Sequence, residues 1–155
     1  MEDEEGLDVA DPATNPWRNG PPSTLRYVAE NPANDDRVYA IMVGEYQDGS
    51  GRTITIQIET GAPDEETIRC GMNTYSVWLE PCYYSFWGDI TEWVIADRTL
   101  TILLTPQRAE DLGFGPRLRF QLALDDDQVT LLRAGLQHTL ATGREDRQPL
   151  RLDLR

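Results

Sequence analysis

Regular alternation of apolar and polar residues predicts strands over much of this chain. Residues 53–59 alternate strictly, which places three isoleucines on one face and polar side chains on the other. Residues 37–45 form a nearly continuous apolar run, and the segment 47–51 between the two is rich in turn-forming residues. We therefore expect a β-hairpin over residues 37–59.

The second half of the chain shows the same pattern. Segments 90–95 and 99–104 predict a second hairpin, and residues 117–124 alternate strictly with leucine and phenylalanine on the inward face. The cluster 25–28 is expected to pack back on the domain as an edge strand. Three leucines alternate within residues 150–154, which favours a further edge strand.

Helical spacing is clearest near the C-terminus, where we predict the main helix over residues 126–142. Its apolar residues define one buried stripe: Val129, Leu132, Leu136 and Leu140. A short helical turn is expected over residues 106–112, because Thr105 can cap its start and Gly113 suits a left-handed end.

These elements predict an α+β fold, with one twisted antiparallel sheet of about six or seven strands and the C-terminal helix packed on one face. We expect an acidic, Pro-rich lead-in over residues 1–36, a folded domain over residues 37–142 and a tail over residues 143–155. The lead-in has nine acidic and two basic residues and few apolar ones, so we expect it to be largely disordered or loosely packed.

Charge narrows the possible partners. The chain has 27 acidic and 14 basic residues, all of the latter arginine, for a net charge of −13. Such a surface repels phosphate backbones and anionic membranes, so a basic protein is the expected kind of partner, although the charge could also serve solubility alone. The N-terminus lacks a signal peptide pattern and no run approaches the ~20 apolar residues of a membrane span, so we expect a cytoplasmic protein.

Residues 73–87 are rich in aromatic side chains and predict two short strands around a turn at residues 80–81. The side chains expected in the core are Trp78, Phe86 and Trp93. The segment has more aromatic residues than a small core needs, and aromatic anchors ringed by charge are typical of binding hot spots. The candidate partner-binding residues are therefore Tyr83, Tyr84, Trp87, Asp89 and Glu92.

A second candidate surface is the acidic cluster of Asp64, Glu65 and Glu66. The same residues suit the first turn of a short helix, because carboxylates oppose the positive end of its dipole. We favour the helix start and keep the partner-facing role as the alternative.

No catalytic or metal-binding motif stands out, and we expect neither metal nor cofactor. His138 is the only histidine and is expected on the exposed face of the main helix, so a His-dependent triad lacks partners. The aspartates at 125–127 favour helix capping over a cation site, because EF-hand spacing does not follow them. Cys70 and Cys82 are expected as reduced thiols, and a disulfide between them remains open.

Four blocks of sequence add a family resemblance through their order and spacing. They are Gly-Met-Asn-Thr-Tyr at 71–75, Trp-Gly-Asp-Ile-Thr-Glu at 87–92, the segment 100–113 that ends in Ala-Glu-Asp-Leu-Gly, and Phe-Gln-Leu-Ala-Leu-Asp-Asp-Asp at 120–127. Together with the closing leucine-rich helix, they resemble the bacterial immunity protein 10 family over roughly residues 37–142. Members of that family are antitoxins encoded beside polymorphic toxins.

The resemblance implies a stoichiometric inhibitor that binds and neutralises a cognate toxin. A nuclease is the natural basic toxin, because its own substrate requires positive charge. Two alternatives remain open. A small hydrolase acting through a carboxylate pair predicts a deep polar pocket that holds two acids of perturbed pKa. An interaction module whose partner is not a toxin predicts an exposed patch instead.

Overall fold

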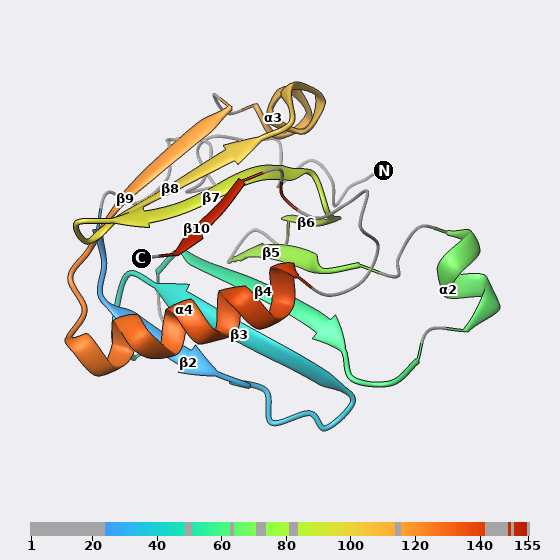
Figure 1. Cartoon of the computed structure of the whole chain (residues 1–155), viewed down its shortest axis with the longest axis horizontal. Coiled ribbons are helices and arrows are strands. Elements are labelled where there is room, and N and C mark those ends of the chain that lie inside the picture. The colour runs from blue at the N-terminus through green and yellow to red at the C-terminus, as the bar shows by residue number, and fades with distance from the viewer. Residues whose placement is uncertain are drawn as a thin grey trace, which may run out of the picture.

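The strands of the chain divide into two five-stranded sheets (Figure 1). The computed structural model describes residues 24–48, 51–62, 64–70, 74–80, 84–113, 116–141, 149 and 151–154. The predicted α+β class and the C-terminal helix are confirmed, but the single antiparallel sheet is replaced by two sheets. Alternating apolar and polar residues show that a strand has one buried face. They do not show to which of two sheets the strand belongs.

The first sheet, which we call the antiparallel sheet, has the order β2-β3-β4-β5-β6. Its strands are Tyr27–Glu30, Val38–Gly44, Thr53–Glu59, Ser76–Glu80 and Tyr84–Trp87. The hairpin expected over residues 37–59 is β3 paired with β4, and the aromatic segment forms β5 and β6. Every neighbouring pair in this sheet is antiparallel.

The second sheet, which we call the mixed sheet, has the order β1-β9-β8-β7-β10. Its strands are Thr24–Leu25, Arg117–Leu122, Thr99–Leu104, Ile90–Ala96 and Arg151–Leu154. The hairpin expected over residues 90–104 is β7 paired with β8. The edge strands β1 and β10 come from the two ends of the described chain and run parallel to their neighbours. The expected strand in the tail is thus confirmed as β10.

Within the described residues, three helices connect or cover the strands: α2 (Glu65–Arg69), α3 (Pro106–Leu112) and α4 (Asp126–Leu140). Thr105 caps α3 by accepting the Arg108 amide, and Gly113 ends it at φ 78°, as predicted. Asp125 and Gln128 form a reciprocal capping box at the start of α4. The predicted apolar stripe of α4 is buried in full.

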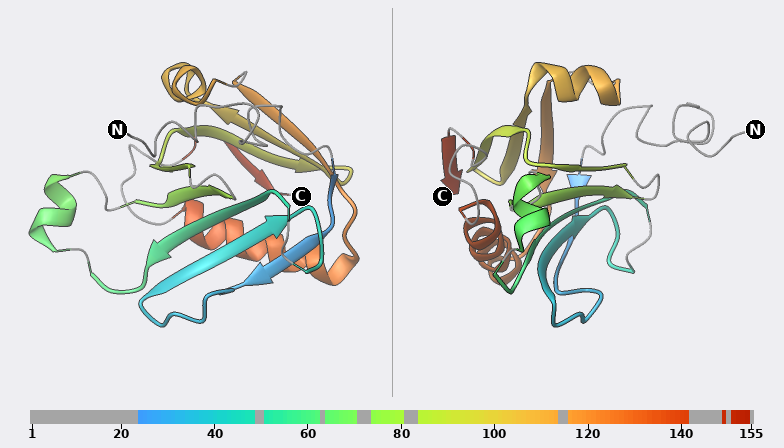
Figure 2. Two further views of the ribbon diagram at one scale, coloured as in Figure 1. Left: turned by 180° about the vertical axis from the view of Figure 1, so that it is seen from behind. Right: turned by 90° about the vertical axis from the view of Figure 1, so that its right-hand side faces the viewer.

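One hydrophobic core lies between the inner faces of the sheets and α4. In Figure 2 the right-hand view shows the mixed sheet above the antiparallel sheet, with α4 and β10 on the same side. The expected core residues Phe86 and Trp93 are 4% and 1% exposed. Trp78 is a correction, because it is only half-buried and lies on the other face of β5 from the buried Val77 and Leu79.

The chain crosses from one sheet to the other between β6 and β7. Gly88 and Asp89 have φ of 68° and 70°, which turns the backbone sharply. The fully buried Tyr75 hydroxyl donates to the Ile90 carbonyl at 3.3 Å and accepts the Ile90 amide at 3.2 Å. The crossing is therefore a fixed corner.

Helix α4 approaches the antiparallel sheet closely at Gly135, which gives a test of the packing. A Cβ added there would lie 2.6 Å from Cγ1 and 2.7 Å from Cβ of Ile41. Helix propensity alone would favour Gly135→Ala by about 1 kcal/mol, whereas overpacking costs about 1–3 kcal/mol. We therefore expect a net fall of up to about 2 kcal/mol in the free energy of unfolding, measured in urea.

The matched control is Gln137→Ala on the exposed side of α4, which should change the free energy of unfolding by less than about 0.5 kcal/mol. An increase in stability for Gly135→Ala would contradict this close packing.

Candidate functional site

The surface of the antiparallel sheet that faces away from the core is the candidate site. Directly paired residues of neighbouring strands share a face, so the strand register defines its two central rows. One row consists of Met42, Thr55, Trp78 and Ser85, and the other consists of Ala40, Gln57, Ser76 and Trp87. We call this surface the outer face. The helix that packs on this sheet, α4, lies on the opposite side, where Gly135 faces Ile41.

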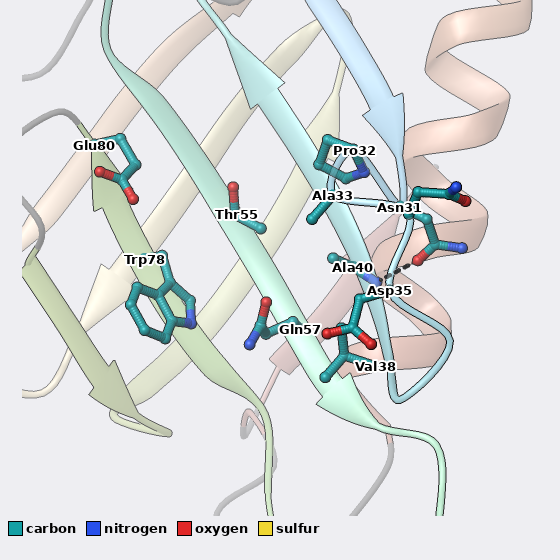
Figure 3. A pocket seen from close by; sticks show the side chains of 11 residues that line it. Asn31, Pro32, Ala33, Asp35, Val38, Ala40, Thr55, Gln57, Trp78 and Glu80 are labelled. Carbon is teal, nitrogen blue, oxygen red and sulfur yellow. Dashed lines mark hydrogen bonds between the residues drawn. The ribbon is translucent and has the colours of Figure 1, made fainter.

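A groove of about 290 Å³ runs across the outer face (Figure 3). One wall is the loop of residues 31–35, which connects β2 and β3, and the other side carries Trp78 and Glu80 of β5. Thr55 and Gln57 lie between them on β4. The alternation that directs the isoleucines of β4 into the core thus leaves these two polar side chains in the groove.

The loop wall is held in place by short polar contacts. The Asn31 amide donates to the Ala40 carbonyl, and the Asn31 side-chain oxygen accepts the Ala40 amide, both at 2.8 Å. Asn31 and Asn34 have φ of 50° and 54°, a left-handed conformation that asparagine tolerates better than most residues. The groove is therefore preformed.

Asp35 lies at one end of this loop and forms an ion pair with Arg37. Its two carboxylate oxygens accept hydrogen bonds from Nε and Nη2 of Arg37, both at 3.1 Å. These hydrogen bonds hold the pKa of the Asp35 carboxyl below its usual value. The carboxylate of Asp35 is thus occupied inside the protein.

Trp78 and Glu80 form the other side of the groove. The indole Nε1 of Trp78 donates to Oγ of Ser76 at 3.0 Å, which fixes the ring against the sheet. Burial raises the pKa of the Glu80 carboxyl. A half-buried carboxylate therefore lies two residues from a half-buried indole, on the same face of one strand.

The groove does not have the form that a carboxylate-pair hydrolase requires. Asp35 and Glu80 lie at opposite ends of it in Figure 3, with Thr55 and Gln57 between them. Asp35 is bound to Arg37, so the two acids do not flank one position where a substrate bond could lie. In the part of the chain that the structure describes, no three His, Cys, Asp or Glu residues are grouped so as to hold a metal ion.

The aromatic and acidic residues proposed as one surface are distributed over both sheets. Trp87 lies half-buried on the outer face, in the row of Gln57. Glu92 lies on β7 of the mixed sheet. Tyr84 belongs to β6, but only its backbone is described, and Tyr83 lies outside the described residues.

Asp89 lies at the corner between the sheets and has a partner within the chain. Its Oδ2 accepts Nε of Arg108 at 2.9 Å and Nη2 at 2.8 Å. The same guanidinium lies over the Phe86 ring, 4.7 Å from its centre. The structure therefore gives Asp89 a role in joining α3 to the corner, and its role in partner binding stays a prediction.

The second predicted cluster lies on α2, which projects away from both sheets (Figure 1). Asp64 caps this helix by accepting the Thr67 amide at 2.7 Å, and Glu65 and Glu66 follow as exposed residues of its first turn. The favoured helix-start interpretation is confirmed. The helix has no buried residue, and its Ile68 is 51% exposed.

Two further side chains considered for chemistry, Cys70 and His138, lie outside the groove. Cys70 is an exposed free thiol, and Cys82 lies outside the described residues. His138 is exposed on α4 as expected, with its ring 4.8 Å from that of Tyr39. Neither Cys70 nor His138 is among the described residues that line the groove.

Sequence reasoning missed Trp78 and the loop of residues 31–35 as parts of a site. A signal for Trp78 was present, because it shares the polar side of β5 with Ser76 and Glu80. The loop gave no such signal, since its position over the outer face depends on the pairing of Asn31 with Ala40.

Comparison with known families assigns this fold. The family model described as immunity protein 10 matches residues 24–130. The chain belongs to the immunity protein 10 family. The match contains the whole outer face, the loop of residues 31–35 and α2. Comparison with curated proteins and with solved structures gives no match. Among the helices that the structure describes, none has the length and apolar character needed to cross a membrane.

The corner ion pair of this family member can be tested by a double-mutant cycle. Asp89→Asn keeps a residue that tolerates positive φ and removes the charge, and Arg108→Met removes the guanidinium. We expect each variant to be less stable and the double variant to lose less than the sum, with a coupling of about 0.5–3 kcal/mol in urea unfolding. Strict additivity would show that the pair adds nothing to stability.

The raised pKa of Glu80 predicts an unusual pH dependence. In the folded protein its charged form is disfavoured, so the contribution of Glu80 to stability is largest below its unfolded pKa and is lost as pH rises through the folded value. Glu80→Gln should therefore melt at the same or a higher temperature than the unaltered protein at pH 7. This gain should shrink towards about pH 4.

Glu110→Gln, an exposed change on α3, is the matched control and should show no such trend between the two pH values. A Glu80→Gln variant that is clearly less stable at pH 7 would contradict the burial of this charge.

Proposed function

We propose that this protein is an immunity protein that neutralises a cognate bacterial toxin by binding it stoichiometrically, without turnover. Membership of the immunity protein 10 family is the observation that carries the proposal. A preformed sheet face with two half-buried tryptophans, Trp78 and Trp87, is consistent with it, because large aromatic side chains supply much of the binding energy at protein interfaces.

The charge of the protein favours a basic toxin, and a nuclease acting in the cytoplasm fits best. A net charge of −13 would accelerate the encounter with a positively charged domain. Aromatic anchors act later, because they slow dissociation once the complex has formed. Inhibition then requires no catalytic group on this chain, since the complex itself blocks the toxin.

The test is co-expression with the product of the adjacent open reading frame in a bacterial host. We expect that product to be toxic alone and harmless together with this protein, and the two to co-purify as a 1:1 complex by light scattering. A version of this gene with an early stop codon is the control for protection by the protein itself. A neighbour that is harmless alone, or toxicity that persists beside well-expressed protein, would contradict the proposal.

A further inference from the structure

The outer face differs from an ordinary solvated sheet surface in its charge pattern. Its two central rows hold no charged side chain, while the groove ends in Asp35 and Glu80. Among the described residues that line the groove, none is basic. The nearest cation of the wall, Arg37, is engaged by Asp35. The described lining of the groove therefore consists of neutral and acidic side chains, and of the two acids Asp35 is the one paired with Arg37.

The chemistry beside Glu80 fits a cation with an alkyl stem. The indole of Trp78 offers a ring face for a guanidinium or ammonium group, and tryptophan is the best aromatic partner for such cations. Gln57 and Thr55 add neutral hydrogen-bonding groups on the floor of the groove. A partly buried carboxylate gains more from a paired cation than an exposed one does, because water screens it less.

We propose that this groove receives an arginine or lysine side chain from a loop of the toxin, with its stem along Trp78 and its charge at Glu80. This inference rests on the proposed function and names the surface and the chemistry through which that function would operate. It makes the outer face, and not the acidic helix α2, the centre of recognition.

Charge disfavours two other occupants of the groove. A second copy of this chain also carries a net charge of −13 and would bring acidic surface towards Asp35 and Glu80. The first 23 residues of the chain contain six acidic residues and one arginine, so they too would meet like charge. A basic partner is the occupant that the electrostatics favour.

The rigidity of the groove supports the same assignment. The ring of Trp78 is fixed by Ser76, and the loop wall is fixed by the two Asn31 hydrogen bonds to Ala40. A preformed groove loses little conformational entropy when a side chain enters it. A long cationic side chain loses more conformational entropy on entering the groove, so its contacts there must be strong enough to offset that loss.

The experiment measures affinity by calorimetry for the purified product of the adjacent open reading frame. Glu80→Gln removes the carboxylate, Trp78→Ala removes the ring, and Gln57→Arg places a cation inside the groove. We expect each variant to bind at least about tenfold more weakly than the unaltered protein. Melting curves accompany each variant, and Glu80→Gln is expected to fold at least as stably as the original.

Glu110→Gln is the matched control, because it removes the same charge from α3, far from the groove (Figure 1). It should bind within about twofold of the unaltered protein, which separates local contact from long-range attraction. An arginine and lysine scan of the toxin domain should then find one position whose substitution adds nothing further to Glu80→Gln.

The outcomes separate the two proposals. If the unaltered protein protects cells and binds the toxin, but Glu80→Gln and Gln57→Arg bind equally well, the groove proposal is wrong and the immunity function stands. If the unaltered protein neither protects nor binds, both proposals fall. If gel filtration shows a dimer that Gln57→Arg dissociates, a second copy occupies the groove and the proposal is overturned.

Discussion

A single buried hydroxyl determines how the two sheets meet. Tyr75 stands before β5 in the antiparallel sheet, and its side chain bonds both polar backbone groups of Ile90, the first residue of β7 in the mixed sheet. The Gly88 amide returns a hydrogen bond to the Tyr75 carbonyl at 3.0 Å. With the corner fixed in this way, the inner faces of both sheets face each other, and the outer face of the antiparallel sheet points away from the core.

The elements of the fold were predictable where local chemistry defines them. Capping residues such as Thr105 and Asp125 fix helix starts within a few residues of themselves, and strict alternation identifies β4 and β9. The division into two sheets was not predictable, because it depends on pairs such as Thr24 with Gln121, which join distant parts of the chain. A parallel edge strand leaves no mark in the local pattern that distinguishes it from an antiparallel one.

The candidate site was predictable only in part, for the same reason. Trp87 lies on the outer face, but Asp89 is bound by Arg108 of α3, a partner that adjacency in sequence does not reveal. Neighbouring aromatic and acidic residues belong to different sheets here, because the chain crosses the corner between them. Trp78 was assigned to the core from its residue type, although its place on the polar side of β5 indicated the surface.

The helix α2 differs from the other described helices because none of its residues is buried. It joins β4 to β5, contributes no side chain to the core and holds its shape largely through the Asp64 cap. Substitutions along its exposed residues therefore carry almost no penalty in folding, whereas most changes on the strands beside it do. Such an element can vary in sequence from one lineage to the next while the scaffold stays constant. The projecting helix is therefore the described element whose sequence is least constrained by folding.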